Sequence, residues 1–422
     1  MWEGLAMVDG RTRVVIEGVT PEIDCGRFPI KRTIGERVVV EADVFTDGHD
    51  AVSAVLLYRR EQDDEWAEVA MAPLVNDRWR AEFPIGEIGR YCYTVVAWVD
   101  HFKTWSRDLV KRAEAGQDLT VDLQIGAELV DEAAAEAPPT DAENLRAVAE
   151  ALRTNATAVV DRALSPELAH LMWRYGPRHY QLRYEKELPV TADPVKARFS
   201  TWYEFFPRST SPEPGRHGTF KDVEARLPYV ASMGFDVLYL PPIHPIGHEH
   251  RKGKNNSVTA EPGEPGSPWA IGSREGGHKA IHAELGTLDD FRQLIESAKA
   301  HGIDVAMDIA FQAAPDNPYV EEHLAWFRQR PDGTIQYAEN PPKKYQDIYP
   351  FDYESADWRA MWDELTDVVR YWCQQGVRIF RVDNPHTKAF GFWEYLIGTI
   401  KAEYPETIFL SEAFTRPKVM YR

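Results

Sequence analysis

The sequence has 422 residues, of which 44% are hydrophobic and 27% charged, a composition typical of a folded protein with two or three domains. Its net charge of -19 repels nucleic acid and anionic membranes, so neither is an expected partner. Three widely spaced cysteines, Cys25, Cys92 and Cys373, predict neither a disulfide framework nor a CxxC metal pair. No signal-peptide pattern and no apolar run of membrane-spanning length is present, so a cytoplasmic location is expected.

Residues 1–112 are predicted to form an N-terminal β-sandwich. The segments Val38–Val44, Ala54–Tyr58 and Tyr91–Val99 are rich in the β-branched and aromatic residues that favour strands. In Tyr91–Val99, every second residue from Tyr91 to Ala97 falls on one face. Turn residues such as Asp47-Gly48 separate the strands and indicate hairpins.

Residues 113–177 are predicted to be a helical insert in this sandwich. The segment Asp131–Pro139 has the composition of a polar, Ala/Pro-rich connection. From Asp141 to Gly176 the apolar residues follow helical spacing, with Leu145, Val148 and Leu152 on one face. The chain is then expected to return to the sandwich as a further strand near 178–192.

Residues 193–422 alternate between predicted strands and helices, which indicates a parallel α/β sheet or barrel. The expected strands are Phe199–Phe206, Asp236–Ile243, Asp304–Ala310, Val377–Asn384 and Thr407–Phe414. Two helices begin with capping-box patterns at Thr219 and Thr287. Long loops at 244–286 and 311–355 follow strands, which places them at the end of a barrel where active sites form. Five strands form either an open sheet or the first five strands of an incomplete (β/α)8 barrel, and the resemblance described below implies the barrel.

Two acidic residues stand at the ends of adjacent predicted strands. Arg381 and Asp383 share a face because side chains alternate along a strand, and the guanidinium keeps the Asp383 carboxylate ionised, as a nucleophile requires. Glu412 ends the next strand and points the same way. Such a pair is expected to be about 5–5.5 Å apart in a retaining glycoside-cleaving enzyme, with Glu412 as general acid and base.

The segments Gly376–Asp383, Phe409–Glu412 and Ala306–Ala310 resemble the signature segments of the α-amylase superfamily. The resemblance implies that Asp308, at the end of the third strand, supports the site by contacting the sugar, together with Arg381. Gln312-Ala313 stands where amylases usually carry Asn-His, so no calcium site is implied. His248-Glu249-His250 lies on a polar loop without metal-binding spacing. We therefore expect neither a metal nor a cofactor.

Longer motifs resemble one family within that superfamily, the bacterial maltosyltransferases that use maltose 1-phosphate. They are Arg251–Asn256, Asp308–Gln312, Tyr337–Tyr349 and Phe380–Lys388. The resemblance implies transfer of a maltosyl group from maltose 1-phosphate to an α-1,4-glucan, in glycogen biosynthesis, by a homodimer associated through its N-terminal domains. It also implies that four residues contact the substrate or its phosphate: Lys252, Gln312, Asp347 and Asn384. Lys344 is implied to have a supporting role.

Two other functions remain open from the residues alone. An α-glucan hydrolase of the neopullulanase or maltogenic amylase type would use the same two carboxylates with water as the acceptor. A non-catalytic glucan-binding protein is the second, although both carboxylates are retained. The superfamily's third carboxylate, on strand seven, would lie beyond Arg422. We therefore expect the functional protein to be longer, and this chain alone to be inactive and poorly folded.

Overall fold

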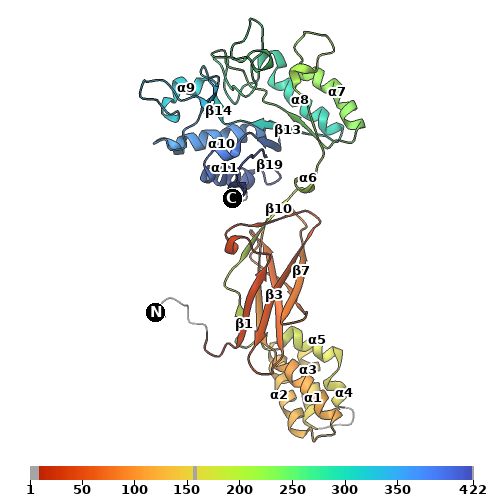
Figure 1. Cartoon of the computed structure of the whole chain (residues 1–422). Coiled ribbons are helices and arrows are strands. Elements are labelled where there is room, and N and C mark those ends of the chain that lie inside the picture. The colour runs from red at the N-terminus through yellow and green to blue at the C-terminus, as the bar shows by residue number, and fades with distance from the viewer. Residues whose placement is uncertain (1–8, 155–158, 421–422) are drawn as a thin grey trace. The chain divides into compact units, whose positions relative to one another are not determined.

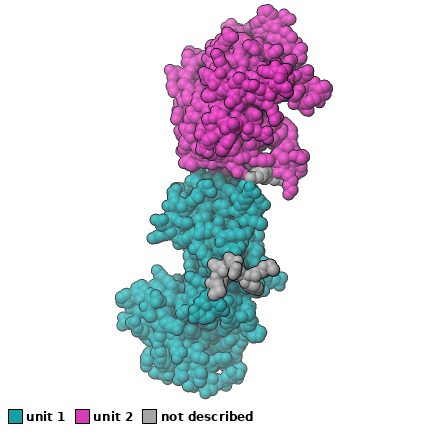
Figure 2. Space-filling view, turned by 90° about the vertical axis from the view of Figure 1, so that its left-hand side faces the viewer, with its two compact units in different colours: residues 1–192 teal, residues 193–422 magenta. Residues whose placement is uncertain are grey.

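The computed structural model describes residues 9–154 and 159–420, with the elements labelled in Figure 1. The chain divides into two units, residues 1–192 and 193–422, which Figure 2 distinguishes by colour. Each unit has hydrophobic clusters of its own, so each is described separately.

The first unit contains two sheets that enclose a shared core. One sheet has the strand order β1-β3-β7-β6, and the other has the order β2-β10-β8-β4-β5, with β9 paired to β8. Alternate residues of β8, from Tyr91 to Val99, are buried in this core. The strands are β1 (Val14–Thr20), β2 (Ile30–Thr33), β3 (Arg37–Thr46), β4 (Val52–Arg60), β5 (Ala67–Ala70), β6 (Ala72–Pro73), β7 (Arg78–Pro84), β8 (Gly89–Val99), β9 (Leu182–Arg183) and β10 (Leu188–Asp193).

Five helices lie between β8 and β9 and pack around a separate apolar cluster. They begin at His101, earlier than the boundary expected at 113. The carboxylate of Asp100 accepts a hydrogen bond of 2.8 Å from the amide of Lys103, so Asp100 caps the first helix directly after the strand. The helices are α1 (His101–Glu114), α2 (Thr120–Glu136), α3 (Pro139–Arg153), α4 (Val159–Ala163) and α5 (Pro166–Tyr175).

The prediction of a connection at Asp131–Pro139 is wrong for most of its length. Helix α2 continues through Glu136, and only a short turn at Ala137 and Pro138 separates it from α3. Val130, Ala133 and Ala134 are buried against the neighbouring helices. Alanine is the best helix former and allows close packing, so an alanine-rich segment between apolar residues forms a helix rather than a linker.

The second unit is built on five parallel strands in the order β11-β12-β13-β18-β19. Long helices follow four of them, as the strand–helix alternation predicts. The main elements are β11 (Trp202–Glu204), α7 (Phe220–Ser232), β12 (Val237–Leu240), α8 (Leu288–Ala300), β13 (Asp304–Ile309), α10 (Trp358–Gln374), β18 (Ile379–Val382), α11 (Phe390–Glu403) and β19 (Ile408–Ser411). Shorter elements are α6 (Val195–Arg198), β14 (Gln312–Ala313), α9 (Pro318–Glu322), β15 (Ala338–Asn340), β16 (Lys343–Tyr345), β17 (Tyr349–Pro350) and α12 (Pro417–Met420).

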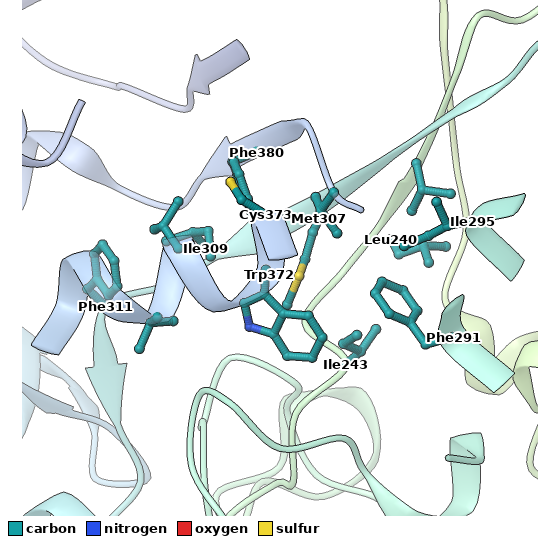
Figure 3. Close-up of a cluster of buried hydrophobic side chains, with 14 of the residues drawn as sticks. Leu240, Ile243, Phe291, Ile295, Met307, Ile309, Phe311, Trp372, Cys373 and Phe380 are labelled. Carbon is teal, nitrogen blue, oxygen red and sulfur yellow. The ribbon is translucent and has the colours of Figure 1, made fainter. Parts of the chain in front are cut away.

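The helices of the second unit cover one face of its sheet. Figure 3 shows Trp372 of α10 among side chains from the strands, including Met307 and Phe380, in the largest apolar cluster of this unit. The indole nitrogen of Trp372 donates to the carbonyl of His278 over 2.9 Å, which satisfies its one polar atom. Both expected capping boxes, at Thr219 and Thr287, are present and fix the starts of α7 and α8.

The other face of the sheet carries a small cluster of strand residues only. Val237, Tyr239, Ala306 and Ile379 are buried there, with Trp202 and Ile408 against them. These residues have the same parity along their strands as Asp308 and Arg381, because side chains alternate between faces. Within the described ranges, no helix has the length and apolar character needed to cross a membrane.

Candidate active site

Three neighbouring strands bring acidic side chains to one end of the parallel sheet. Asp308 of β13 stands directly opposite Arg381 of β18. The amide of Asp383 donates to the carbonyl of Ile309 over 2.9 Å, and that of Glu412 donates to the carbonyl of Val382 over 3.0 Å. These main-chain bonds continue the sheet past β18 and β19. They place the carboxyl groups beside one another at its C-terminal edge.

Arg381 contacts all three carboxylates of this group. Its Nη1 atom donates to Asp308 over 2.7 Å and to Asp383 over 2.9 Å, and its Nη2 atom lies 2.6 Å from an oxygen of Glu412. The exposed side-chain fractions are 0% for Asp308, 9% for Asp383, 15% for Arg381 and 30% for Glu412. Glu412 is therefore the carboxylate most open to solvent, and Asp308 is enclosed.

Burial raises the pKa of Asp308 to about 7, although Arg381 opposes the rise. The hydroxyl of Tyr239 donates to Asp308 over 2.5 Å, which also favours the charged form. The other carboxylate oxygen, Oδ1, is buried without a hydrogen-bond partner in the described part of the chain. The two donors Arg381 and Tyr239 thus bond the same oxygen of Asp308, Oδ2.

Burial is also the main reason that the pKa of Glu412 is raised. Arg381 opposes this effect, whereas a side-chain hydrogen bond with Asp383 and the charge of Asp383 add to it. The two carboxyl groups are therefore close enough to influence each other's protonation. Both carboxyl groups also contact Arg381, Asp383 through Nη1 and Glu412 through Nη2.

The chain turns sharply after Asp383. Asn384 has a left-handed backbone conformation, with φ of 43° and ψ of 53°, which asparagine tolerates better than most residues. Its side-chain amide donates to Asp383 over 3.3 Å. Asn384 therefore contacts the candidate nucleophile directly.

The long loops bring together Lys252 and Asp347, two of the residues expected to contact the substrate. The ammonium group of Lys252 lies 5.7 Å from the ring centre of Tyr345. Asp347 is buried, and its Oδ1 atom has no hydrogen-bond partner among the described residues. Burial raises the pKa of Asp347, while the charges of Lys252 and His250 act against this rise. Lys252 and Asp347 thus form a second charged group.

Gln312 and Lys344 differ in their relation to the acidic group. The side-chain amide of Gln312 donates to the carbonyl of Trp269 over 2.9 Å. The indole of Trp269 in turn interacts with Asp308 and favours its charged form, so Trp269 connects the two. Lys344 stands opposite Glu339 in the β15–β16 hairpin and is exposed, and among the described residues no hydrogen bond or ion pair joins it to the acidic group.

One cluster in the described ranges could hold a metal ion, formed by His217, His282 and Glu284, with ligand atoms within 4.8 Å of one another. Glu284 is exposed. Burial is the main cause that lowers the pKa of His282, and the charges of His217 and Arg251 add to this lowering. The positive charge of Arg251 also disfavours a bound cation. We therefore assign no metal to this cluster.

Sequence reasoning missed three residues around the carboxylates, namely Tyr239, Trp269 and Lys388. Tyr239 lies on the same strand face as Val237. The alternation of side chains along β12, combined with the strand order, would therefore have placed it beside Asp308. Trp269 comes from a long loop whose path no periodicity predicts. Lys388 donates to main-chain carbonyls of Asp383 and Asn384, and helical or strand patterns give no sign of this role.

Comparisons with known proteins divide the chain in the same way as its fold. Residues 12–194 match the family model described as α-1,4-glucan:maltose-1-phosphate maltosyltransferase, domain N/S. Residues 204–363 match the model for the α-amylase catalytic domain. Among solved structures, an α-amylase from Lactobacillus plantarum is 32% identical with a TM-score of 0.43, covering 51% of this chain and 46% of that one.

Curated relatives that match almost the whole chain are named α-1,4-glucan:maltose-1-phosphate maltosyltransferase. The relative from Chlorobaculum tepidum is 56% identical over 98% of this chain and 62% of its own length. The chain thus spans 62% of that relative. One from Cereibacter sphaeroides is 50% identical over 97% of this chain and 69% of its own length. The matches cover nearly all of both units, and the chain belongs to the α-1,4-glucan:maltose-1-phosphate maltosyltransferase family.

Proposed function

We propose that this protein transfers a maltosyl group from maltose 1-phosphate to the non-reducing end of an α-1,4-glucan, with retention of configuration and release of phosphate. The observation that carries the proposal is the group of three carboxylates around Arg381 at adjacent strand ends. Asp383 is paired with a guanidinium, whereas the pKa of Glu412 is raised. This difference suits a nucleophile beside a general acid and base.

In the first step, the Asp383 carboxylate attacks the anomeric carbon of maltose 1-phosphate. The bond from that carbon to the phosphate oxygen breaks, and the electron pair leaves with phosphate. Glu412 donates its proton to the departing oxygen. The product is a maltosyl ester of Asp383 with inverted configuration.

In the second step, a hydroxyl group of the glucan attacks the same carbon. The ionised Glu412 takes the hydroxyl proton, and the bond to Asp383 breaks and returns the electron pair to its carboxylate. A second inversion restores the α configuration. Arg381 supports the reaction by holding the two reacting carboxylates in place, and Asp308, which contacts Arg381, binds the sugar.

We propose that Lys252, Gln312, Asp347 and Asn384 contact the donor, with Lys344 in a supporting role. A phosphate leaving group needs positive charges and N–H donors, which a protein of net charge -19 must supply locally. Lys252 and the amide of Asn384 are such groups, and Asn384 already contacts Asp383. The buried oxygen of Asp347 without a partner suits a sugar hydroxyl.

We propose that the second unit contributes the first five strands of a (β/α)8 barrel. Its strands are all parallel and in sequential order, helices cover one face, and the small strand-only cluster on the other face resembles the filled interior of a barrel. We also propose the domain division into a sandwich, a helical insert and a catalytic barrel.

For the intact protein we propose a homodimer formed through the N-terminal domains, located in the cytoplasm and acting in glycogen biosynthesis. Helix α2 exposes Val121 and Ile125, which supplies apolar surface for such an interface. The carboxylate-rich surface and the net charge of -19 favour neither nucleic acid nor anionic membranes as partners.

The test is an assay of the protein at its native length for release of phosphate. Phosphate should appear only when maltose 1-phosphate and an α-1,4-glucan are both present, and the glucan should grow by two glucose units at a time. Release of maltose from starch without any phosphate dependence would instead identify a hydrolase. Binding of glucan with no turnover of either kind would favour a non-catalytic protein.

A matched pair of lysine variants in the same assay examines the phosphate contact. Lys252→Met should raise KM for maltose 1-phosphate about 10-fold or more, since one charge-assisted contact is lost. Lys254→Met, two residues away on an exposed part of the same loop, should leave KM unchanged. Equal KM values in the two variants would contradict a contact between Lys252 and the donor phosphate.

A further inference from the structure

The turn after Asp383 is the least regular part of the candidate site. Asn384 has the left-handed conformation that costs most residues about 1 kcal/mol or more, so the surrounding contacts must hold it. The hydroxyl of Thr387 donates to the carbonyl of Asn384 over 2.8 Å, and the indole of Trp393 donates to that of Pro385 over 2.9 Å. The position of Asp383 therefore depends on main-chain carbonyls that follow it.

Lys388 supplies the one charged donor to these carbonyls among the described residues. Its Nζ atom donates to the carbonyl of Asp383 over 3.3 Å and to that of Asn384 over 3.2 Å. The side chain thus reaches back across the turn from its far end and joins the carbonyl of the nucleophile itself to that of Asn384, whose side-chain amide contacts the nucleophilic carboxylate.

The place of this ammonium group is unfavourable for two independent reasons. Burial lowers the pKa of Lys388 to about 8. Lys388 also stands just before the start of helix α11 at Phe390, where the helix dipole disfavours a positive charge. Helix stability therefore does not explain this lysine.

The compensating charges belong to the active site. Asp383, Asp308 and Glu412 all favour the charged form of Lys388. Together with Arg381, Lys388 gives two positive charges to balance these three carboxylates, so the ammonium group remains favoured near neutral pH despite burial.

We propose that Lys388 is a positioning residue for the nucleophile: its ammonium group holds the left-handed turn that aims the Asp383 carboxylate at the anomeric carbon. The inference rests on the proposed function, in which Asp383 forms the covalent intermediate. Lys388 itself does not touch the sugar. Its loss should therefore slow formation of the intermediate without weakening donor binding.

The test measures formation of the Asp383 adduct in the protein at its native length. Mass spectrometry follows the reaction with 2-deoxy-2-fluoro-α-maltosyl fluoride, alongside kcat and KM for maltose 1-phosphate. Lys388→Met should slow adduct formation and lower kcat by about 100-fold, with KM changed by less than about threefold. Lys388→Gln keeps an N–H donor for the carbonyls and should recover part of the rate, and it replaces the Met variant if that variant fails to fold.

Lys401 offers a matched control on α11. Its ammonium group also donates to main-chain carbonyls, those of Thr407 over 2.8 Å and Pro405 over 3.3 Å, but at the start of β19 rather than at its end. Lys401→Met should lower the melting temperature and leave adduct formation unchanged. Adduct formation by both Lys388 variants at the wild-type rate, or equal slowing by Lys401→Met, would overturn the proposal.

The wild-type results separate this inference from the proposed function. An adduct on Asp383 without phosphate release from maltose 1-phosphate would reject maltosyl transfer and still allow the role of Lys388 to be judged from the variants. Absence of any adduct on Asp383 in the wild-type protein would overturn both the nucleophile and the role of Lys388.

Discussion

Arg381 is the side chain around which the acidic residues of the site are arranged. It contacts Asp308, Asp383 and Glu412 at once, with only 15% of its side chain exposed. Removing one partner of a buried ion pair leaves the other charge uncompensated and commonly costs about 3–5 kcal/mol. A substitution of Arg381 would therefore disturb folding and chemistry together, and the acidic residues are better targets for separate tests.

Asp308 predicts a distinctive dependence of stability on pH. Burial raises its pKa from the ordinary value to about 7, so the folded protein binds this proton more tightly than the unfolded chain does. The contribution is fully present below the unfolded pKa, near 4, and is lost as pH rises through about 7. In thermal unfolding between pH 4 and 7, Asp308→Asn should therefore lose less stability with rising pH than the wild-type protein.

Asp290 provides a control with the opposite sign. Hydrogen bonds from Thr287 lower the pKa of Asp290, so its contribution is present above the unfolded pKa and is lost as pH falls through the folded value. Asp290→Asn should reduce the loss of stability in acid and leave the slope between pH 5 and 7 unchanged. A slope for Asp308→Asn identical to that of the wild-type protein would contradict the raised pKa.

The sequence predicts some of these side chains and misses others for a physical reason. Alternation along one strand correctly places Arg381 and Asp383 on the same face. The contact of Tyr239 with Asp308 joins the neighbouring strands β12 and β13. It therefore depends on strand order, which alternation along one strand does not specify. The contact of Arg381 with Glu412 joins two strands, so it too depends on strand order.

At the scale of elements, α1 and α2 pack closely because α2 has a glycine at the contact. A Cβ atom at Gly126 would overlap the indole ring of Trp105 in α1. The indole nitrogen of Trp105 also donates to the carbonyl of Asp122 over 2.7 Å, which fixes the ring against α2. The ring therefore has little freedom to move away from a larger side chain.

Gly126→Ala should destabilise the helical bundle by about 1–3 kcal/mol, because overpacking outweighs the better helix propensity of alanine. Amide hydrogen exchange in the peptides of α1 and α2 measures this loss locally. Gly398→Ala in α11 is the control, since a Cβ there meets no atom within 4 Å. It should stabilise α11 by up to about 1 kcal/mol. Equal protection in α1 and α2 before and after Gly126→Ala would contradict the tight contact.

Element boundaries show which sequence signals are dependable. The capping boxes at Thr219 and Thr287 mark helix starts correctly because two reciprocal hydrogen bonds form within four residues. Composition misled at 131–139, where alanine and glutamate form the end of α2. Local hydrogen bonding is contained in the local sequence, whereas the burial of Ala133 depends on neighbouring helices.

At the scale of the whole molecule, one sheet of the first unit is completed by a strand that follows the helices in the sequence. Strand β10 lies between β2 and β8, and its Leu188, Val190 and Ala192 are buried in the sandwich core. Sequence pattern predicts a returning strand in this region. It does not predict the two neighbours of that strand, because pairing over such a separation is decided by the assembled core.

This arrangement predicts how the first unit behaves when it is cut. A fragment of residues 1–192 should unfold cooperatively, since both of its main apolar clusters lie within it. A fragment of residues 1–180 lacks β9 and β10 and leaves Tyr93 of β8 without the partner that it has in Leu188. It should lose the sandwich while keeping the helices, whose cluster lies between Trp105 and Met172.

Circular dichroism and hydrogen exchange distinguish the two fragments. Residues 1–180 should keep helical ellipticity and protected amides in α2 and α3, with rapid exchange in β4 and β8. Residues 1–192 should protect both regions. Because the buried face of β10 belongs to the sandwich alone, equal protection of β8 in the two fragments would show that the remaining strands hold their sheet without it. The sandwich would then not depend on β10, the strand that follows the helices.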